Sequence, residues 1–334
     1  MAGYEKSDVD AHVAALIGEK NITMKSVRAY QDERARFVFQ YAKEHSRFYR
    51  ELYADIEGVR TTDDLLQLPV ITGEHVRQYG ARMLCVDQER IERIYTTGGS
   101  TGKPKRLYFT KQELEQTVKF YEEGIPSFIG PGDTVLILLP CGKPYSVGRL
   151  FGDSVERVGA APVYGGMPET MDLAYRMLME SRANVAMTAP HYMLGMLKLG
   201  LPLPRLKSIV ISTDYLDPGD KASLTEAFHA PVFEHYAMTE MCFGGGVECG
   251  AHAGFHMREA DFFFEIIHPD GTRVAPGEYG LLVFTTLRRE GMPLIRYATG
   301  DVTRMIKEPC PCKSILPLYD KMQKRENQKA YSEN

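Results

Sequence analysis

Short apolar runs alternate with longer amphipathic stretches through the middle of this 334-residue chain, and that alternation constrains the fold more than any other feature. The runs expected as strands are 133–139, 161–164, 183–187 and 207–211. The stretches expected as helices are 147–158, 169–181, 191–199 and 218–228, and Thr110 with Glu113 offers a capping box for one more. Strands that alternate with helices predict an α/β fold with a mostly parallel sheet and helices on both faces.

The sequence patterns before and after this α/β region differ from it. Residues 27–55 are expected as one long amphipathic helix, and a shorter helix is expected from Thr72. Later, 262–267 and 279–284 have the character of strands that pair antiparallel through the turn at Pro269–Gly271. We therefore expect a helical N-terminal region (1–90), an α/β core (91–240), a smaller β-rich subdomain (241–320) and a short tail (321–334).

Bulk composition excludes several classes of protein. A net charge of −4 argues against a nucleic-acid-binding surface, which needs a basic excess. No apolar run approaches the roughly 18 residues of a membrane span, and the first residues lack a basic start followed by an apolar segment, so neither membrane insertion nor secretion is expected. Six cysteines are too few for a disulfide scaffold of this length, which favours a reduced, cytoplasmic setting.

The segment Tyr95–Lys105 concentrates glycines, hydroxyl groups and lysines in eleven residues. Such a loop can wrap a polyphosphate with backbone N–H groups, hydroxyls and ammonium groups, although a plain flexible loop has the same composition. It is not the common P-loop, because Pro104 follows Lys103 and disfavours a helix start there. The residues that offer these groups are Thr97, Gly98, Gly99, Ser100, Thr101, Gly102 and Lys103, with Lys105 beyond them.

Further blocks follow this loop in a recognisable order. They are His235–Glu240, then Gly277–Gly280, then Thr285–Leu287, then Gly291–Asp301. Together with the loop they resemble the adenylate-forming superfamily of acyl-CoA synthetases, and most closely its phenylacetate–CoA ligase branch, which includes related synthetases that adenylylate a deazaflavin coenzyme. The resemblance covers roughly residues 28–325. It implies the large N-terminal domain of these enzymes, with a nucleotide- and acyl-binding core at 91–240.

The resemblance implies that a carboxylate attacks the α-phosphorus of ATP, giving acyl-AMP and pyrophosphate. Glu240 would bind Mg²⁺, a cation that takes one or two protein carboxylates. Thr239 would lie near the α-phosphate and Tyr236 would stack on adenine, while Asp301 would accept hydrogen bonds from the ribose. Arg296 would either support its own loop or contact phosphate. The implied catalytic residues are thus Glu240, Thr239 and Lys103, although Ala237 replaces a usual glycine and 212–214 departs from the usual turn beside adenine.

An acyl pocket and a metal site are also expected. The pocket would be lined by residues from 140–151 and from the second motif, although most of these could equally be plain core. Its candidates are Tyr145, Gly148, Phe151, Met238 and Phe243. Three cysteines and one histidine can fill a tetrahedral zinc site, and the pattern of Cys249, His256, Cys310 and Cys312 is similar to a zinc-binding subset of these ligases, with His252 the weaker histidine candidate. Cys85, Cys141 and Cys242 are expected as buried small hydrophobes.

Enzymes of this superfamily continue into a mobile C-terminal domain that supplies a catalytic lysine, whereas this sequence stops near the expected hinge. The expectation is therefore slow adenylation of a small aromatic acid, with little or no thioester formed. CoA, a carrier protein or a partner that supplies the domain would be involved, and a dimer is plausible. The alternatives are a nucleotide- or acyl-binding subunit or sensor without turnover, and adenylylation of a deazaflavin hydroxyl.

Overall fold

The computed structural model describes residues 9–97 and 104–323, and these residues fold into two units. The first unit is built from Leu114–His256 with Cys310–Ser314, and the second from Asp10–Glu113, Met257–Pro309 and the segment that begins at Ile315. The boundary expected at 240 therefore lies inside the first unit. The N-terminal helices and the later antiparallel strands, which we expected as separate regions, share the second unit. The part of the tail at 324–334 lies outside the described residues.

The first unit contains the mostly parallel sheet that the alternation predicted. Its strands lie in the order β9-β8-β7-β6-β5-β3-β4. The pairs from β4 to β7 are parallel, and β8 returns antiparallel to β7. The strand bounds are β3 Thr134–Leu138, β4 Ala161–Tyr164, β5 Val185–Thr188, β6 Ser208–Ile211, β7 Val232–Tyr236, β8 Gly246–Glu248 and β9 Phe255–Met257.

Helices connect these strands as expected. The capping box that starts the first is present, because the Thr110 N–H donates to Glu113 Oε2 at 2.8 Å and the Glu113 N–H donates to Thr110 Oγ1 at 3.3 Å. The helix bounds are α5 Lys111–Gly124, α6 Val147–Arg157, α7 Met171–Ser181, α8 Pro190–Lys198 and α9 Pro218–Phe228, with short 3₁₀ turns η4 Ile125–Ser127 and η5 Thr239–Met241.

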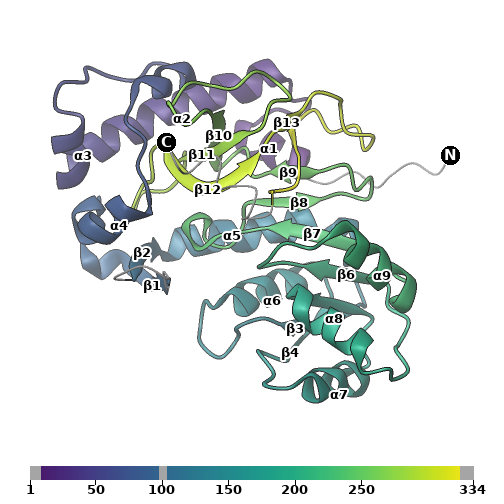
Figure 1. Cartoon of the computed structure of the whole chain (residues 1–334). Coiled ribbons are helices and arrows are strands. Elements are labelled where there is room, and N and C mark those ends of the chain that lie inside the picture. The colour runs from purple at the N-terminus through teal and green to yellow at the C-terminus, as the bar shows by residue number, and fades with distance from the viewer. Residues whose placement is uncertain (1–8, 98–103, 324–334) are drawn as a thin grey trace. The chain divides into compact units, whose positions relative to one another are not determined.

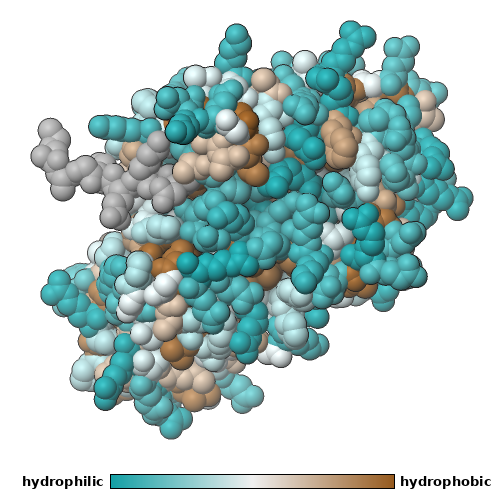
Figure 2. Space-filling model, turned by 180° about the vertical axis from the view of Figure 1, so that it is seen from behind, coloured by the Kyte–Doolittle hydropathy of each residue, from teal (hydrophilic) through white to brown (hydrophobic). Residues whose placement is uncertain are grey.

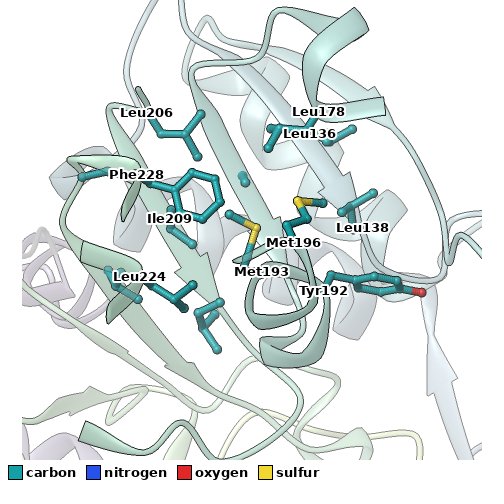
Figure 3. Close-up of a cluster of buried hydrophobic side chains, with 14 of the residues drawn as sticks. Leu136, Leu138, Leu178, Tyr192, Met193, Met196, Leu206, Ile209, Leu224 and Phe228 are labelled. Atoms are coloured by element: carbon teal, nitrogen blue, oxygen red, sulfur yellow. The ribbon is translucent and has the colours of Figure 1, made fainter. Parts of the chain in front are cut away.

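Apolar side chains on the two faces of this sheet hold the helices. On one face, α7, α8 and α9 pack on β3, β5 and β6 (Figure 1). Figure 3 shows Met193 and Met196 of α8 directed at the strands, beside Leu136 and Ile209. Side chains alternate along a strand, so the other face of β7 presents His235, whose ring lies 5.3 Å from that of Tyr121 of α5. Helices on both faces therefore bury the sheet, as predicted.

The second unit is built on a three-stranded antiparallel sheet in the order β10-β11-β12. The pairing of the first two strands confirms the predicted hairpin. The long N-terminal helix expected at 27–55 is broken, because Ser46 takes an extended conformation and its side chain caps the next helix at the Tyr49 N–H. The bounds are α1 Val9–Ile17, α2 Met24–His45, α3 Arg47–Leu52, β10 Phe262–Ile267, β11 Gly280–Thr286, β12 Tyr297–Thr303, β13 Met305–Ile306 and β14 Leu318–Tyr319.

A β-hairpin completes the second unit. Strands β1 (Ile91–Thr97) and β2 (Lys105–Thr110) pair antiparallel, with Thr97 opposite Lys105. The helix expected from Thr72 is present, with Thr72 as its N-cap. The bounds of this helix and the neighbouring 3₁₀ turns are η1 Thr62–Gln67, α4 Gly73–Tyr79, η2 Gly80–Met83 and η3 Gln88–Arg90.

One face of the molecule is predominantly polar. On the face in Figure 2, hydrophilic residues predominate and hydrophobic ones form only small separate groups. Among the described residues, no helix combines the length and the apolar character that a membrane crossing requires. Cys85, Cys141 and Cys242 are buried, as expected.

Candidate functional site

The glycine-rich segment joins the two strands of the β1–β2 hairpin. The ladder continues to the pair Thr97 and Lys105, so both ends of the loop are held together. The Lys105 ammonium lies 3.3 Å from the Tyr297 hydroxyl of β12, and Thr97 Oγ1 is buried without a hydrogen-bond partner among the described residues. The loop residues Gly98, Gly99, Ser100, Thr101, Gly102 and Lys103 lie outside the described residues. The sequence reasoning found the loop but not the hairpin that carries it.

The second motif begins at the end of β7, in the first unit. The buried Tyr236 is the last residue of this strand, and its ring lies 6.2 Å from that of Phe255. Thr239 and Glu240 lie in the turn η5, where Glu240 is buried to 3% exposure. The end of a parallel strand is where α/β sheets usually present ligand-binding groups. The buried carboxylate of Glu240 is a hard oxygen donor of the kind that Mg²⁺ prefers.

Asp301 and Arg296 belong to the second unit, on and just before β12. Asp301 is partly exposed, and its N–H donates to Thr299 Oγ1 at 3.0 Å. Arg296 is buried, and its guanidinium is engaged by protein groups: it donates to the carbonyls of Leu66 and Leu68 at 2.9 and 2.7 Å. It also lies 3.3 Å from Glu265 Oε2. Of the two roles left open for Arg296, the structure supports the one that holds its loop.

Two of the predicted acyl-pocket residues converge on a residue that the sequence reasoning missed. The ring of Tyr121 meets that of Phe151 edge-on at 5.4 Å, and its hydroxyl donates to the Phe243 carbonyl. His235 contacts the same tyrosine ring. Burial lowers the pKa of His235 to about 3, so its imidazole is neutral. The position of His235 directly before Tyr236 in the motif could have identified it, whereas nothing in the sequence singled out Tyr121.

The other three pocket candidates, Met238, Tyr145 and Gly148, have different neighbours from Phe151 and Phe243. Met238 is extended before η5, and its sulfur is 4.0 Å from the Tyr236 hydroxyl. Tyr145 takes a left-handed conformation just before α6. Gly148 allows a close approach of backbones, because a Cβ there would lie 2.9 Å from the Pro140 carbonyl oxygen. Backbone packing alone therefore explains why a glycine stands at position 148.

The cysteine and histidine candidates lie together in the first unit. The ligand atoms of Cys249, His256, Cys310 and Cys312 all lie within 4.8 Å of one another, and all four residues are buried. The sulfurs of Cys249 and Cys310 are 3.6 Å apart, and Cys312 Sγ is 3.4 Å from His256 Nε2. Tetrahedral Zn²⁺, with bonds of about 2.0–2.3 Å, separates its ligands by roughly 3.4–3.8 Å. The donor set and its spacing fit such an ion.

The electrostatics of this cluster favour a cation. Burial raises the pKa of Cys310, and the hydrogen bond with Cys249 lowers the pKa of Cys312 to about 3 while it raises that of Cys249. Three buried sulfurs this close can be thiolates together only when a dication compensates their charge. His252 is not part of this cluster. Its Nδ1 lies 3.3 Å from Glu248 Oε2, and its ring packs on Phe233. The choice of His256 over His252 therefore agrees with the geometry.

Known proteins share this fold and sequence. The family of AMP-binding enzymes matches residues 10–285. A phenylacetate-coenzyme A ligase of Thermus thermophilus is 29% identical over 313 residues, which covers 88% of this chain and 69% of the relative. The enzyme of the same name from Aromatoleum evansii is 30% identical over 301 residues, or 84% of this chain and 67% of the relative.

A solved structure shares the fold. The open conformation of 2-hydroxyisobutyryl-CoA ligase, in complex with 2-HIB-AMP and CoA, aligns with a TM-score of 0.76 at 23% identity. It covers 86% of this chain and 71% of that chain, so the fold is shared over most of both. The sequence match, the resemblance to two named ligases and the common fold agree. The chain belongs to the family of AMP-binding enzymes, the adenylate-forming ligases.

Proposed function

We propose that this protein activates a small aromatic carboxylic acid with ATP, forming acyl-AMP and pyrophosphate, and that CoA is the acceptor of the acyl group. The motif at the end of β7 carries this proposal, because it presents Glu240 and Thr239 directly after a buried strand of an α/β sheet. The names of the relatives support the aromatic acid and the CoA acceptor. A binding protein without turnover is less well supported, since these relatives are ligases.

Each residue has a role that its chemistry suits. Glu240 would hold Mg²⁺, which neutralises charge on the phosphates when it is bound. Thr239 would donate its hydroxyl to the α-phosphate, and Asp301 would accept hydrogen bonds from the ribose. Lys103 and the loop around it would hold the outer phosphates, so that the acid can attack in line. Arg296 would act indirectly, since its guanidinium holds the backbone before β12.

The acyl group would lie against the rings of Tyr121 and Phe151, beside Phe243, whose carbonyl accepts the Tyr121 hydroxyl. Aromatic rings meet edge-on there, and this packing mode suits a further ring. Tyr145 and Met238 would complete the pocket, while Gly148 would shape it through the close approach to Pro140.

A pyrophosphate-exchange assay tests this function. With ATP, Mg²⁺ and a panel of arylacetates, benzoates and short aliphatic acids, we expect exchange to be fastest with aromatic acids. Glu240→Gln should lower the rate by about 10²–10³, because it removes a charge that supports the transition state. The control is Glu226→Gln, which changes an exposed glutamate on α9. Absence of exchange with every acid, or equal rates in Glu240→Gln and wild type, would refute the proposal.

We also propose that Cys249, His256, Cys310 and Cys312 bind a structural Zn²⁺. Four protein ligands close the coordination sphere, so the ion would have no open position for a reacting water. Its contribution would be to the stability of the first unit, because metal binding to such a site is coupled to folding.

A further inference from the structure

A groove in the second unit is lined by residues to which the proposed function assigns no role. It has a volume of about 500 Å³ and lies between the end of α4, the turn η2 and the start of β2. Arg77, Arg82 and Arg106 line it together with Tyr79 and Tyr108. Three of its ten lining residues are arginines and none is Asp or Glu, although the whole chain has a net charge of −4. The groove is thus a concentration of positive charge on an acidic protein.

The acidic partners of these arginines leave much of that charge available. Arg77 Nε donates to Glu74 Oε2 at 2.7 Å, and Arg82 pairs with Glu51. Both carboxylates are well exposed, at 69% and 56%, and exposed pairs of this kind contribute little. Arg106 is exposed on β2 and forms no ion pair with any residue that the structure describes. An incoming anion can therefore replace weak partners at two positions and meet an unpaired guanidinium at the third.

The size and the side chains of the groove narrow the class of ligand. A volume of about 500 Å³ is that of a site for one small molecule. Guanidinium groups bind phosphate through paired hydrogen bonds, and several of them favour a ligand with more than one phosphate group. The Tyr79 ring lines the same groove, and the Arg82 guanidinium lies 5.4 Å from its centroid. Aromatic side chains beside cations suit a nucleotide, which joins a planar base to phosphates.

We propose that this groove binds the phosphate groups of an adenine nucleotide, with Arg106 and Arg82 as the main ligands. CoA and ATP both have this chemistry. Binding itself does not depend on turnover, whereas CoA as the occupant rests on the proposed function. The experiment therefore distinguishes CoA from ATP as the occupant, and it measures binding rather than turnover.

Calorimetric titration of the full chain with CoA, ATP and inorganic pyrophosphate tests the site. The variants are Arg106→Gln and Arg82→Gln, and the matched control is Arg60→Gln, an exposed arginine of the same unit that does not line the groove. Each groove variant should weaken binding of the occupant about tenfold. This factor is at the lower end of the range for a hydrogen bond to a charged group, because the groove is exposed. The affinity of the wild type should also fall with rising salt.

The pattern across ligands identifies the occupant. Weaker CoA binding with unchanged ATP binding assigns the groove to CoA, and the reverse pattern assigns it to ATP. If both groove variants bind all three ligands as the control does, or if the wild type binds no nucleotide, the proposal is overturned. Because the failure of pyrophosphate exchange would leave these titrations unaffected, a failure of the proposed function and a failure of this site are distinguishable. The charge-preserving Arg106→Lys should retain part of the affinity if charge is what matters.

Discussion

Glu259 should make the stability of this protein fall as the pH rises, because its carboxyl is buried beside neutral partners. Gln31 Nε2 of α2 donates to Glu259 Oε2 at 2.7 Å, and the Tyr319 hydroxyl donates to Oε1 at 3.0 Å. Glu259 is only 4% exposed, and burial raises its pKa from 4.5 to about 7, against the lowering effect of these hydrogen bonds. The folded state therefore holds this proton more tightly than the unfolded chain does.

The size and the sign of the effect follow from that difference. A carboxyl whose pKa is raised on folding contributes full stability below the unfolded pKa near 4.5, and this contribution is lost as the pH rises through 7. Each tenfold difference in proton affinity corresponds to about 1.4 kcal/mol, so the complete loss is about 3 kcal/mol and the part between pH 5 and 8 is about 2.5 kcal/mol. Glu259→Gln keeps the shape of the side chain and removes the proton equilibrium.

Urea denaturation of both proteins at pH 5, 6, 7 and 8 measures this contribution. The free energy of unfolding of the wild type, relative to that of Glu259→Gln, should fall by about 2.5 kcal/mol from the lowest to the highest pH. Glu57→Gln, which changes an exposed glutamate of the same unit, controls for the loss of one carboxyl from the chain. A difference between wild type and Glu259→Gln that stays constant with pH, or grows in favour of the wild type, would refute the reasoning.

Three further outcomes are expected. Although burial disfavours its charge, neighbouring arginines hold the pKa of the Asp261 carboxyl well below its usual range. Asp261→Asn should thus cost about 3–5 kcal/mol at pH 7 in urea denaturation, a deficit that narrows as the pH falls below about 4. Cys312→Ser should lose bound zinc by metal analysis and melt earlier, whereas Cys242→Ser, at a buried cysteine outside the cluster, should keep its zinc. Gly148→Ala should destabilise by about 1–3 kcal/mol because its Cβ meets a fixed carbonyl, while Gly142→Ala, with open space around it, should be nearly neutral in the same thermal scan.

The parallel sheet could be predicted from local pattern because its strands are short, apolar and separated by helices with their own start signals. The expected helix at 218–228 coincides with α9, which begins at a proline and is capped by the Asp217 side chain. The break between α2 and α3 was missed, because Ser46 lies inside a continuous amphipathic pattern. The residue that it caps, Tyr49, is buried, and the Tyr49 hydroxyl donates to the carbonyl of the distant Pro293, a tertiary contact that no local pattern predicts.

In the candidate sites, too, some contacts could be predicted from the sequence and others could not. Cys249 and Cys310 are 61 residues apart, so only the resemblance to known ligases could suggest that they meet. The role of Arg296 could not be chosen from sequence, since its acceptors are the carbonyls of Leu66 and Leu68. Backbone groups carry no sequence signal. Tyr121 also has no sequence signal, because an aromatic residue on an amphipathic helix is expected as core. Only the structure shows that its hydroxyl donates to the Phe243 carbonyl.

A metal bound by the cysteine cluster would affect the motif at the end of β7, for which we propose nucleotide binding, without contacting it. Strand β8 pairs with β7 so that Gly246 lies opposite Tyr236, and Cys249 follows β8 directly. Glu248, at the end of β8, accepts the Glu234 N–H of β7 at 2.9 Å and pairs with Lys221 of α9 at 2.8 Å. A metal that fixes Cys249 would therefore also fix β8, the strand that pairs with the end of β7. Loss of the metal should therefore loosen the end of β7 and lower nucleotide affinity together with stability, although none of the four metal-site residues belongs to the motif at 236–240.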